Sequence, residues 1–296
     1  MNPLIFPCAV QHLCAGLLLH RLNASESEEQ QPERRWDERQ SLKENDMLTS
    51  IRGLVAASVL IGCGLTAVPA FADEETAPPS EITVTGNVVL TTDYRFRGLS
   101  LSGGDAAIQG TINVNHSSGF YVGAWASNLE DSAVYGNMEL DVYGGWTGEV
   151  TSGLTADVGL LYYVYPNGKV GDANVFEPYA SLSTTFGPAT AKLGVAYAWK
   201  QDSLGGDDNL YLYTDLGVGI PSTPITVSAH LGYTSGALSP KLLTLQSTDG
   251  GLDYSVGATY GITKSLSVGV SYVGAEGNSI DSFSNDAVVG TLKFAF

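Results

Sequence analysis

From residue 82 onward, apolar and polar side chains alternate along the chain with a period of two residues. This period is typical of a β-strand with one apolar and one polar face. In the first stretch the apolar-rich face carries Ile82, Val84, Gly86, Val88, Leu90, Thr92, Tyr94 and Phe96. The opposite face carries Thr83, Thr85, Asn87, Val89, Thr91, Asp93, Arg95 and Arg97. A run of about 15 residues exceeds the five or six of an ordinary strand.

The alternation recurs along the rest of the chain and predicts about twelve strands, with no 3.6-residue periodicity long enough for a helix. The expected strands are 82–97, 108–115, 120–128, 137–146, 154–163, 175–186, 189–199, 209–220, 225–234, 252–261, 266–273 and 286–296. Short connections are expected at 116–119, 147–153, 187–188, 221–224 and 262–265, and longer ones at 99–105, 129–136, 166–173, 200–208, 235–251 and 274–285. Short turns on one rim and long loops on the other are the plan of an outer-membrane barrel.

Aromatic residues of the apolar faces gather near the predicted strand ends. With both termini on the periplasmic side, those at the outer ends are Tyr94, Phe96, Tyr162, Phe176, Tyr197, Trp199, Tyr233, Tyr254 and Tyr272. Those at the inner ends are Phe120, Trp146, Phe186, Tyr260, Phe294 and Phe296. Two such girdles mark the two membrane interfaces. The alternation that ends at Phe294 and Phe296 is also typical of the last strand that the barrel assembly machinery reads.

The apolar faces need a surrounding other than water. An open sheet with these faces would aggregate through its surface and its two free edges. In lipid, only a closed barrel pairs every backbone group within the sheet. We therefore predict an all-β chain, in which residues 82–296 form a closed, antiparallel, up-and-down transmembrane β-barrel of about 12 strands in contact with outer-membrane lipid.

Residues 47–72 have the features of a cleavable secretory signal peptide. Arg52 precedes an apolar run, and Ala70 and Ala72 form an A-x-A cleavage site. Two rival interpretations are an uncleaved membrane anchor and a lipoprotein box that would lipidate Cys63. We favour cleavage after Ala72 and export to the bacterial outer membrane, because the apolar run continues past the point where a lipoprotein would become polar.

The signal peptide divides the rest of the N-terminal region into two segments. Residues 73–81 form a short polar linker before the barrel. Residues 1–46 precede the signal, which is an unusual place for a signal peptide. The simplest account is that translation starts at Met47 and that residues 1–46 are a non-native extension.

Composition narrows the classes of function. The formal net charge of −17 argues against nucleic acid as a partner. The three cysteines, Cys8, Cys14 and Cys63, all precede the predicted barrel, which excludes a disulfide framework or a cysteine metal site within it.

Several stretches resemble the TorF family of outer-membrane porins. They are GNVVLTTDYRFRGLSLSGGDAAIQGTINVNHSSGFYVGAWASNLE (Gly86–Glu130), ELDVYGGW (Glu139–Trp146), LLYYVYPNG (Leu160–Gly168) and FEPYASLS (Phe176–Ser183). The resemblance covers essentially the whole region after the signal peptide. It implies an exported outer-membrane barrel and names no substrate.

Enzyme chemistry has little support in the predicted barrel. His116 lies in a short turn beside serines, and His230 lies on a polar strand face with Ser228 two residues away. Same-face neighbours on one strand are about 7 Å apart, too far for a hydrogen bond between a nucleophile and its base. A serine from an adjacent strand could still approach His230. The acidic loop at 205–208 lacks the ligand spacing of a metal site, so we predict no enzyme, cofactor or metal.

Function is expected on the inward face. The candidate pore-lining residues are Asp93, Arg95, Arg97, Glu139, Asp141, Asp157, Glu177, Lys192, Asp215 and Asp253. His230, Lys293 and several tyrosines share this face. Twelve strands lie between filled barrels of about eight strands and open pores of 16–18. We predict a porin-like channel for small hydrophilic solutes or ions that weakly prefers cations. The alternatives are a closed structural or adhesion barrel and, less favoured, a barrel enzyme that acts on lipids.

Overall fold

The computed structural model describes residues 81–296. The predicted extension (1–46), the signal peptide (47–72) with its cleavage residues Ala70 and Ala72, and nearly all of the linker (73–81) lie outside the described residues. Their predictions stay predictions.

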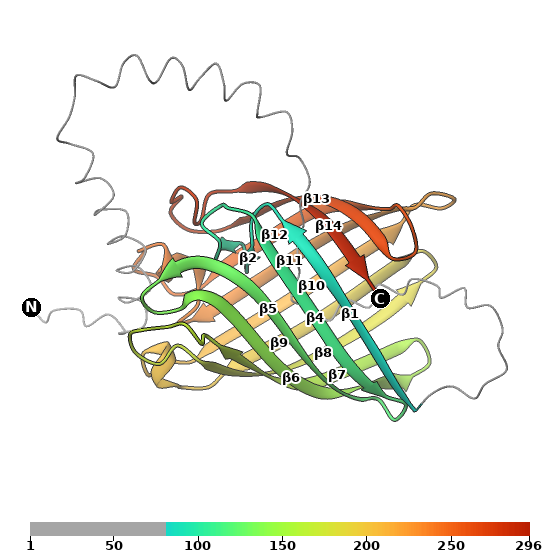
Figure 1. Ribbon diagram of the computed structural model, residues 1–296, viewed down its shortest axis with the longest axis horizontal. Helices are drawn as coiled ribbons and strands as arrows, with labels where there is room; N and C mark the ends of the chain where they lie inside the picture. Colours follow the sequence, from blue (N-terminus) through green and yellow to red (C-terminus); the bar gives the residue numbers. More distant parts are fainter. Residues whose placement is uncertain (1–80) are drawn as a thin grey trace, which may run out of the picture.

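Twelve antiparallel strands form one closed barrel, as the alternation predicts (Figure 1). The barrel strands are β1 (Ile82–Thr91), β4 (Ala107–His116), β5 (Phe120–Ser132), β6 (Gly136–Thr151), β7 (Leu154–Val164), β8 (Val175–Phe186), β9 (Ala189–Ala198), β10 (Asn209–Gly219), β11 (Ile225–Gly236), β12 (Gly251–Gly261), β13 (Leu266–Ala275) and β14 (Ala287–Ala295). Each strand pairs with the next barrel strand along the chain, and β1 closes the sheet on β14.

The side-chain alternation has its expected physical meaning. In β1 the outward Val88 and Leu90 are exposed, whereas Val89 between them is only 2% exposed. The same contrast separates Val158 and Leu160, which are exposed, from Leu161, which is buried in the interior. A one-residue slip would turn every side chain to the wrong face, so the alternation fixes the register. The resulting apolar exterior far exceeds the patches that soluble monomers expose.

The two ends of the barrel differ. We call the end with the short connections 117–119, 152–153, 187–188, 220–224 and 262–265 the turn end, and the opposite end the loop end. Ile82 and Phe296 lie at the turn end, because Ile82 pairs with His116 and Phe296 follows the last paired residues of β14. One predicted loop is largely strand: β5 extends to Ser132 and β6 begins at Gly136, past a register shift in their pairing.

The first predicted strand is too long at its outer end. β1 ends at Thr91, and residues 92–106, which we call the inserted segment, fold into the barrel at the loop end. Within it β2 (Arg95–Phe96) and β3 (Leu99–Ser100) form a small hairpin, with positive φ at Arg97 and Gly98.

This fold of the inserted segment corrects the predicted outer girdle. Tyr94 is 1% exposed and packs on Trp125 inside the barrel, and Phe96 packs edge-on against Tyr163. Neither residue faces lipid. The apolar residues of the inserted segment pack in the barrel interior. This interior is an apolar environment, and a sequence pattern cannot distinguish it from lipid.

Other predicted interface aromatics do lie on the exterior. At the loop end Tyr162, Phe176 and Trp199 form a continuous stack, with ring centroids 4.0 Å and 6.0 Å apart. At the turn end Phe120 and Phe186 are among the most exposed apolar side chains. Stacked aromatic rings with one polar edge suit the boundary between lipid and water.

The barrel closes at a seam beside the C-terminus. The backbone N–H of Gly86 donates to the carbonyl of Phe296 at 2.9 Å, and the N–H of Phe296 donates back at 3.0 Å. A side chain at Gly86 would meet the Phe296 ring, with a Cβ only 2.6 Å from Cζ. Glycine on β1 therefore makes room for the last aromatic residue of the chain.

The loop end is covered by short structures from several loops. These include a 3₁₀ turn at Asp202–Leu204 and the helix α3 (Pro240–Leu243), whose first turn is capped by Ser239. No helix in the described part of the chain is long and apolar enough to span a membrane. Lys241 Nζ lies 2.7 Å from Glu276 Oε2 in the next long loop and is the main reason why the pKa of Glu276 is lowered.

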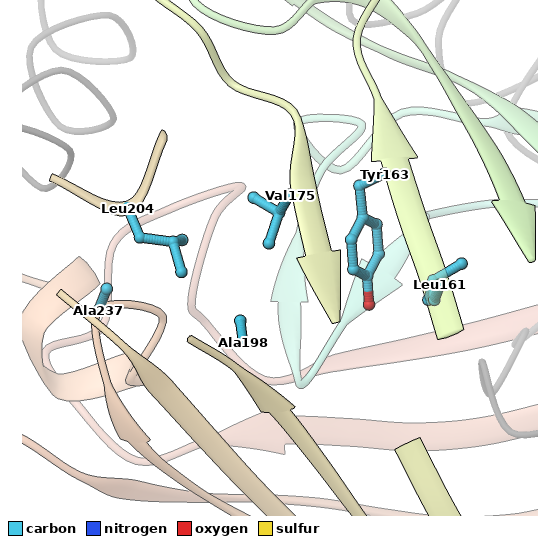
Figure 2. Packing of buried hydrophobic residues seen from close by; sticks show 6 residues of the cluster. All are labelled: Leu161, Tyr163, Val175, Ala198, Leu204 and Ala237. Carbon is cyan, nitrogen blue, oxygen red and sulfur yellow. The ribbon is translucent and has the colours of Figure 1, made fainter. Parts of the chain in front are cut away.

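Apolar packing is concentrated inside the loop-end half of the barrel. Figure 2 shows one cluster, formed by Leu161, Tyr163, Val175, Ala198, Leu204 and Ala237. Phe96 of the inserted segment packs against it. A further cluster joins Leu99 of the segment to Leu243 of α3 and Phe283 of the last loop. The segment is thus held by packing on the wall and on two covering loops.

Candidate functional site: the barrel lumen

The structure places the candidate lumen residues in two groups. Seven strand residues alternate with exposed apolar neighbours and belong to the inner side of the wall: Glu139, Asp141, Asp157, Glu177, Lys192, Asp215 and Asp253. The other three, Asp93, Arg95 and Arg97, belong to the inserted segment. Sequence reasoning put these three on the wall itself because it extended the first strand.

Arg95 is a brace of the inserted segment. Its Nε donates to Asp93 Oδ2 at 2.5 Å, and its Nη1 donates to the carbonyls of Gly98 and Asn285. Asp93 also accepts a hydrogen bond from Ser100 at 2.6 Å. These bonds close the small hairpin on itself and tie it to the last long loop.

Arg97 joins the inserted segment to the opposite wall. Its Nη2 donates to both carboxylate oxygens of Glu177 on β8, at 2.8 Å each. Glu177 also accepts a hydrogen bond from the hydroxyl of Tyr163 at 2.8 Å. The guanidinium carbon lies 4.1 Å from the ring centroid of Tyr211 and 4.7 Å from that of Phe96. This geometry combines an ion pair with cation–π contacts on two rings.

Two more carboxylates lie beside this ion pair. Glu139 accepts hydrogen bonds from Tyr94 at 2.9 Å and Tyr165 at 3.0 Å. Asp141 is 1% exposed, and its Oδ1 has no hydrogen-bond partner among the described residues. Asp141 lies close enough to Glu139 and Glu177 for its charge to interact with both.

His230 on β11 is the centre of a second polar network. Its Nδ1 lies 2.6 Å from Asp215, and its Nε2 lies 3.0 Å from Asp253 and 2.8 Å from the Tyr211 hydroxyl. Both ring nitrogens are engaged by these partners, which leaves neither available to a serine nucleophile. Tyr211 connects the two networks, since it also covers the Arg97 guanidinium.

The turn-end half of the lumen is lined differently. Tyr121 donates to Asp157 at 2.6 Å and lies 2.5 Å from the Tyr179 hydroxyl. Tyr143 donates to Asn113 at 2.6 Å. These side chains are only partly buried, in contrast to the carboxylates near the loop end.

Glycines opposite the tyrosines explain how the rings fit on this wall. A Cβ at Gly123 would lie 2.6 Å from the ring of Tyr143, and one at Gly159 would lie 2.5 Å from that of Tyr179. A Cβ at Gly194 would overlap the ring of Tyr213. The rings therefore lie over glycine backbone along the wall, where they cover the glycines.

Among the described residues, no group of three or more His, Cys, Asp or Glu side chains is arranged to hold a metal ion. The lumen features that sequence reasoning missed are the inserted segment and its aromatic contacts. A signal for the segment was present in Gly98, Gly103 and Gly104, all of which adopt positive φ and mark tight turns.

These features define a closed twelve-stranded antiparallel barrel with an apolar exterior and an interior lined by ionisable side chains. Residues 75–295 match the family described as "Bacterial protein of unknown function (Gcw_chp)", and the chain belongs to this family. No curated protein matches the chain.

Several solved outer-membrane porins and channels are similar in structure. The NanC porin is 13% identical with a TM-score of 0.49, and the match covers 72% of this chain and 99% of that one. The KdgM porin, solved in complex with disordered oligogalacturonate, is 9% identical with a TM-score of 0.48, covering 72% and 98%. The COG4313 outer membrane channel from Pseudomonas putida F1 is 10% identical with a TM-score of 0.44, covering 75% and 99%. Likenesses at this level say nothing of what this chain transports.

Proposed function

We propose that this protein is a porin-like channel of the bacterial outer membrane for small hydrophilic solutes or ions. The observation that carries the proposal is the pairing of a lipid-compatible exterior with charged interior side chains that are only partly buried. Asp157, Lys192 and Asp215 lie on the inner face of the wall and keep part of their surface accessible. Charged groups are costly to remove from water, so these side chains favour a water-filled lumen over a dry core.

Weak cation preference is the second part of the proposal. The inward face and the segment together carry seven acids (Asp93, Glu139, Asp141, Asp157, Glu177, Asp215 and Asp253) and four bases (Arg95, Arg97, Lys192 and Lys293). The two arginines pair with Asp93 and Glu177. The remaining acids then face two lysines and His230, and an excess of carboxylates in a confined lumen attracts cations.

Processing and assembly belong to the same proposal. Cleavage after Ala72 would deliver the chain to the barrel assembly machinery, which would read the strand that ends in Phe294 and Phe296. The resemblance to TorF porins supports this route. Intact mass of the membrane-extracted protein tests it: a chain that begins at Asp73 is expected, and an acylated chain that begins at Cys63 would contradict it.

A closed structural barrel is the second candidate. It is favoured by one observation, the inserted segment, which packs with buried apolar clusters in the loop-end half. Recordings in planar bilayers separate the two candidates. We expect the channel to give stepwise conductance and a reversal potential that indicates cation selectivity. Anion selectivity would contradict the preference, and a silent bilayer with folded protein would favour the closed barrel.

A further inference from the structure

The guanidinium of Arg97 occupies a site that the barrel wall builds without it. The wall contributes Glu177 from β8, Tyr163 from β7 and Tyr211 from β10. Arg97 and Phe96 come from the inserted segment, which is a separate part of the chain. We call Glu177, Tyr163 and Tyr211 the wall cage.

The wall cage is suited to a cation. With the inserted segment in place Glu177 is 2% exposed, and a carboxylate buried in this way is strongly unfavourable without a cation beside it. The hydroxyl of Tyr163 holds one carboxylate oxygen at 2.8 Å, and the Tyr211 ring offers its face to the cation. A planar, delocalised cation fits a carboxylate and an aromatic face together.

Arg97 fills this cage incompletely. Only Nη2 reaches the carboxylate, and Nη1 is buried without a partner among the described residues. The backbone at Arg97 has φ +47°, a conformation that side chains other than glycine seldom adopt. A free guanidinium carries no such tether, and it can form the two parallel hydrogen bonds to a carboxylate that this geometry denies to Arg97.

A further carboxylate lies near the cage. Asp141 is buried and lies close enough to Glu177 for the two groups to interact electrostatically. Among the described residues Arg97 is the base that pairs with Glu177. The Glu177 carboxylate therefore favours a cation over a neutral or anionic solute of the same shape.

We infer that the wall cage is a binding site for guanidinium-bearing solutes and that Arg97 is its intramolecular occupant. The inference deepens the proposed channel function, on which it rests for the statement that such cations are among the permeant solutes. An arriving guanidinium competes with Arg97 for Glu177 and Tyr211, and its binding releases the inserted segment from the β8 wall.

Calorimetric titration of the folded, full-length barrel in detergent micelles with methylguanidinium tests the site. Arg97→Ala vacates the cage and should bind the probe at least about tenfold more tightly than the unmodified protein, because a competent site that is free only part of the time loses affinity in proportion. The double variant Arg97→Ala/Glu177→Gln should lose this binding. Urea, which is planar and neutral, should not bind. Lys169→Ala removes a cation from an exposed loop outside the cage and should behave as the unmodified protein does.

Equal affinity of Arg97→Ala and the unmodified protein, or binding that survives Glu177→Gln, would overturn the inference. If Arg97→Ala does not fold by itself, refolding with methylguanidinium gives the second measurement. Rescue of the heat-modifiable band by methylguanidinium and not by urea supports the site, and no rescue by either contradicts it. Because titration in micelles needs no conduction, a silent bilayer would reject the channel and leave the site standing, and a conducting barrel without binding would reject the site alone.

Discussion

Tyrosines line both halves of the lumen but in different surroundings. In the loop-end half, tyrosines donate to buried carboxylates, as Tyr94 and Tyr165 do to Glu139, and the inserted segment packs between the walls. Toward the turn end, Tyr121 and Tyr143 are only partly buried and lie over glycines of the wall. The comparison teaches that one residue type can fill the interior at one end of a barrel and cover the wall toward the other.

The largest expected effect comes from removing the inserted segment. Replacement of residues 93–104 by a short glycine–serine turn should raise single-channel conductance several-fold, since the loop-end half would lose its filling. Shortening the exposed loop at residues 166–172 is the matched control and should leave conductance unchanged. Equal conductance of both variants would show that the segment is not the constriction.

The next effect tests the wall that both halves share. Arginine at the lipid-facing Val158 should destabilise the barrel by about 2–4 kcal/mol in folding titrations into lipid vesicles. Arginine at the adjacent, inward-facing Asp157 should destabilise the barrel less. It removes one hydrogen bond from Tyr121, which is worth about 1 kcal/mol, and the new charge stays in the lumen. Similar costs at the two positions would count against the alternation in β7.

The glycines that lie under the tyrosine rings offer the next test. Valine at Gly194 would overlap the Tyr213 ring and should cost about 1–3 kcal/mol of folding stability. In the variant with the shortened segment it should also lower conductance, because the displaced ring enters the lumen. Gly219→Val is the control, since its Cβ would have no neighbour closer than 3.8 Å. Equal folding stability and conductance of the Gly194→Val and Gly219→Val variants would contradict the need for glycine beneath the Tyr213 ring.

The seam between β1 and β14 should respond to loss of Phe296. Deletion of Phe296 removes two backbone hydrogen bonds with Gly86 and the ring that covers this glycine. We expect less assembled protein in cells, measured by heat-modifiable migration on gels, with the Phe294→Leu variant less affected. Unchanged assembly after the deletion would remove the proposed role of the C-terminal strand in assembly.

The smallest effect concerns selectivity. Alanine at both Arg95 and Arg97 frees Asp93 and Glu177 from their ion pairs and should strengthen cation preference by on the order of twofold. Reversal potentials across a salt gradient measure the change, and the difference should fade at high salt as exposed charges are screened. A shift toward anions would contradict the charge count of the lumen.

The sequence predicts the wall of the barrel well and its contents poorly, for a physical reason. Strand positions follow from the period of two, because Val158 must face lipid when Asp157 faces the lumen. The pattern reports only whether a residue avoids water, so it placed Tyr94 and Phe96 in lipid when they pack inside the barrel. The Arg97–Glu177 pair joins residues 80 positions apart, and no local pattern encodes such a contact.

The seam between β1 and β14 also sets the order of folding. Every other pairing in the barrel wall joins strands that follow one another along the chain, so each can form by closing a short loop. The seam joins the first and last strands of the barrel, so its loop-closure entropy is lost in one long-range step. Until β14 has paired with β1, both strands keep an open edge. The chain is therefore exposed to aggregation until the seam closes, and the slow phase of folding should be closure of this seam rather than formation of the hairpins.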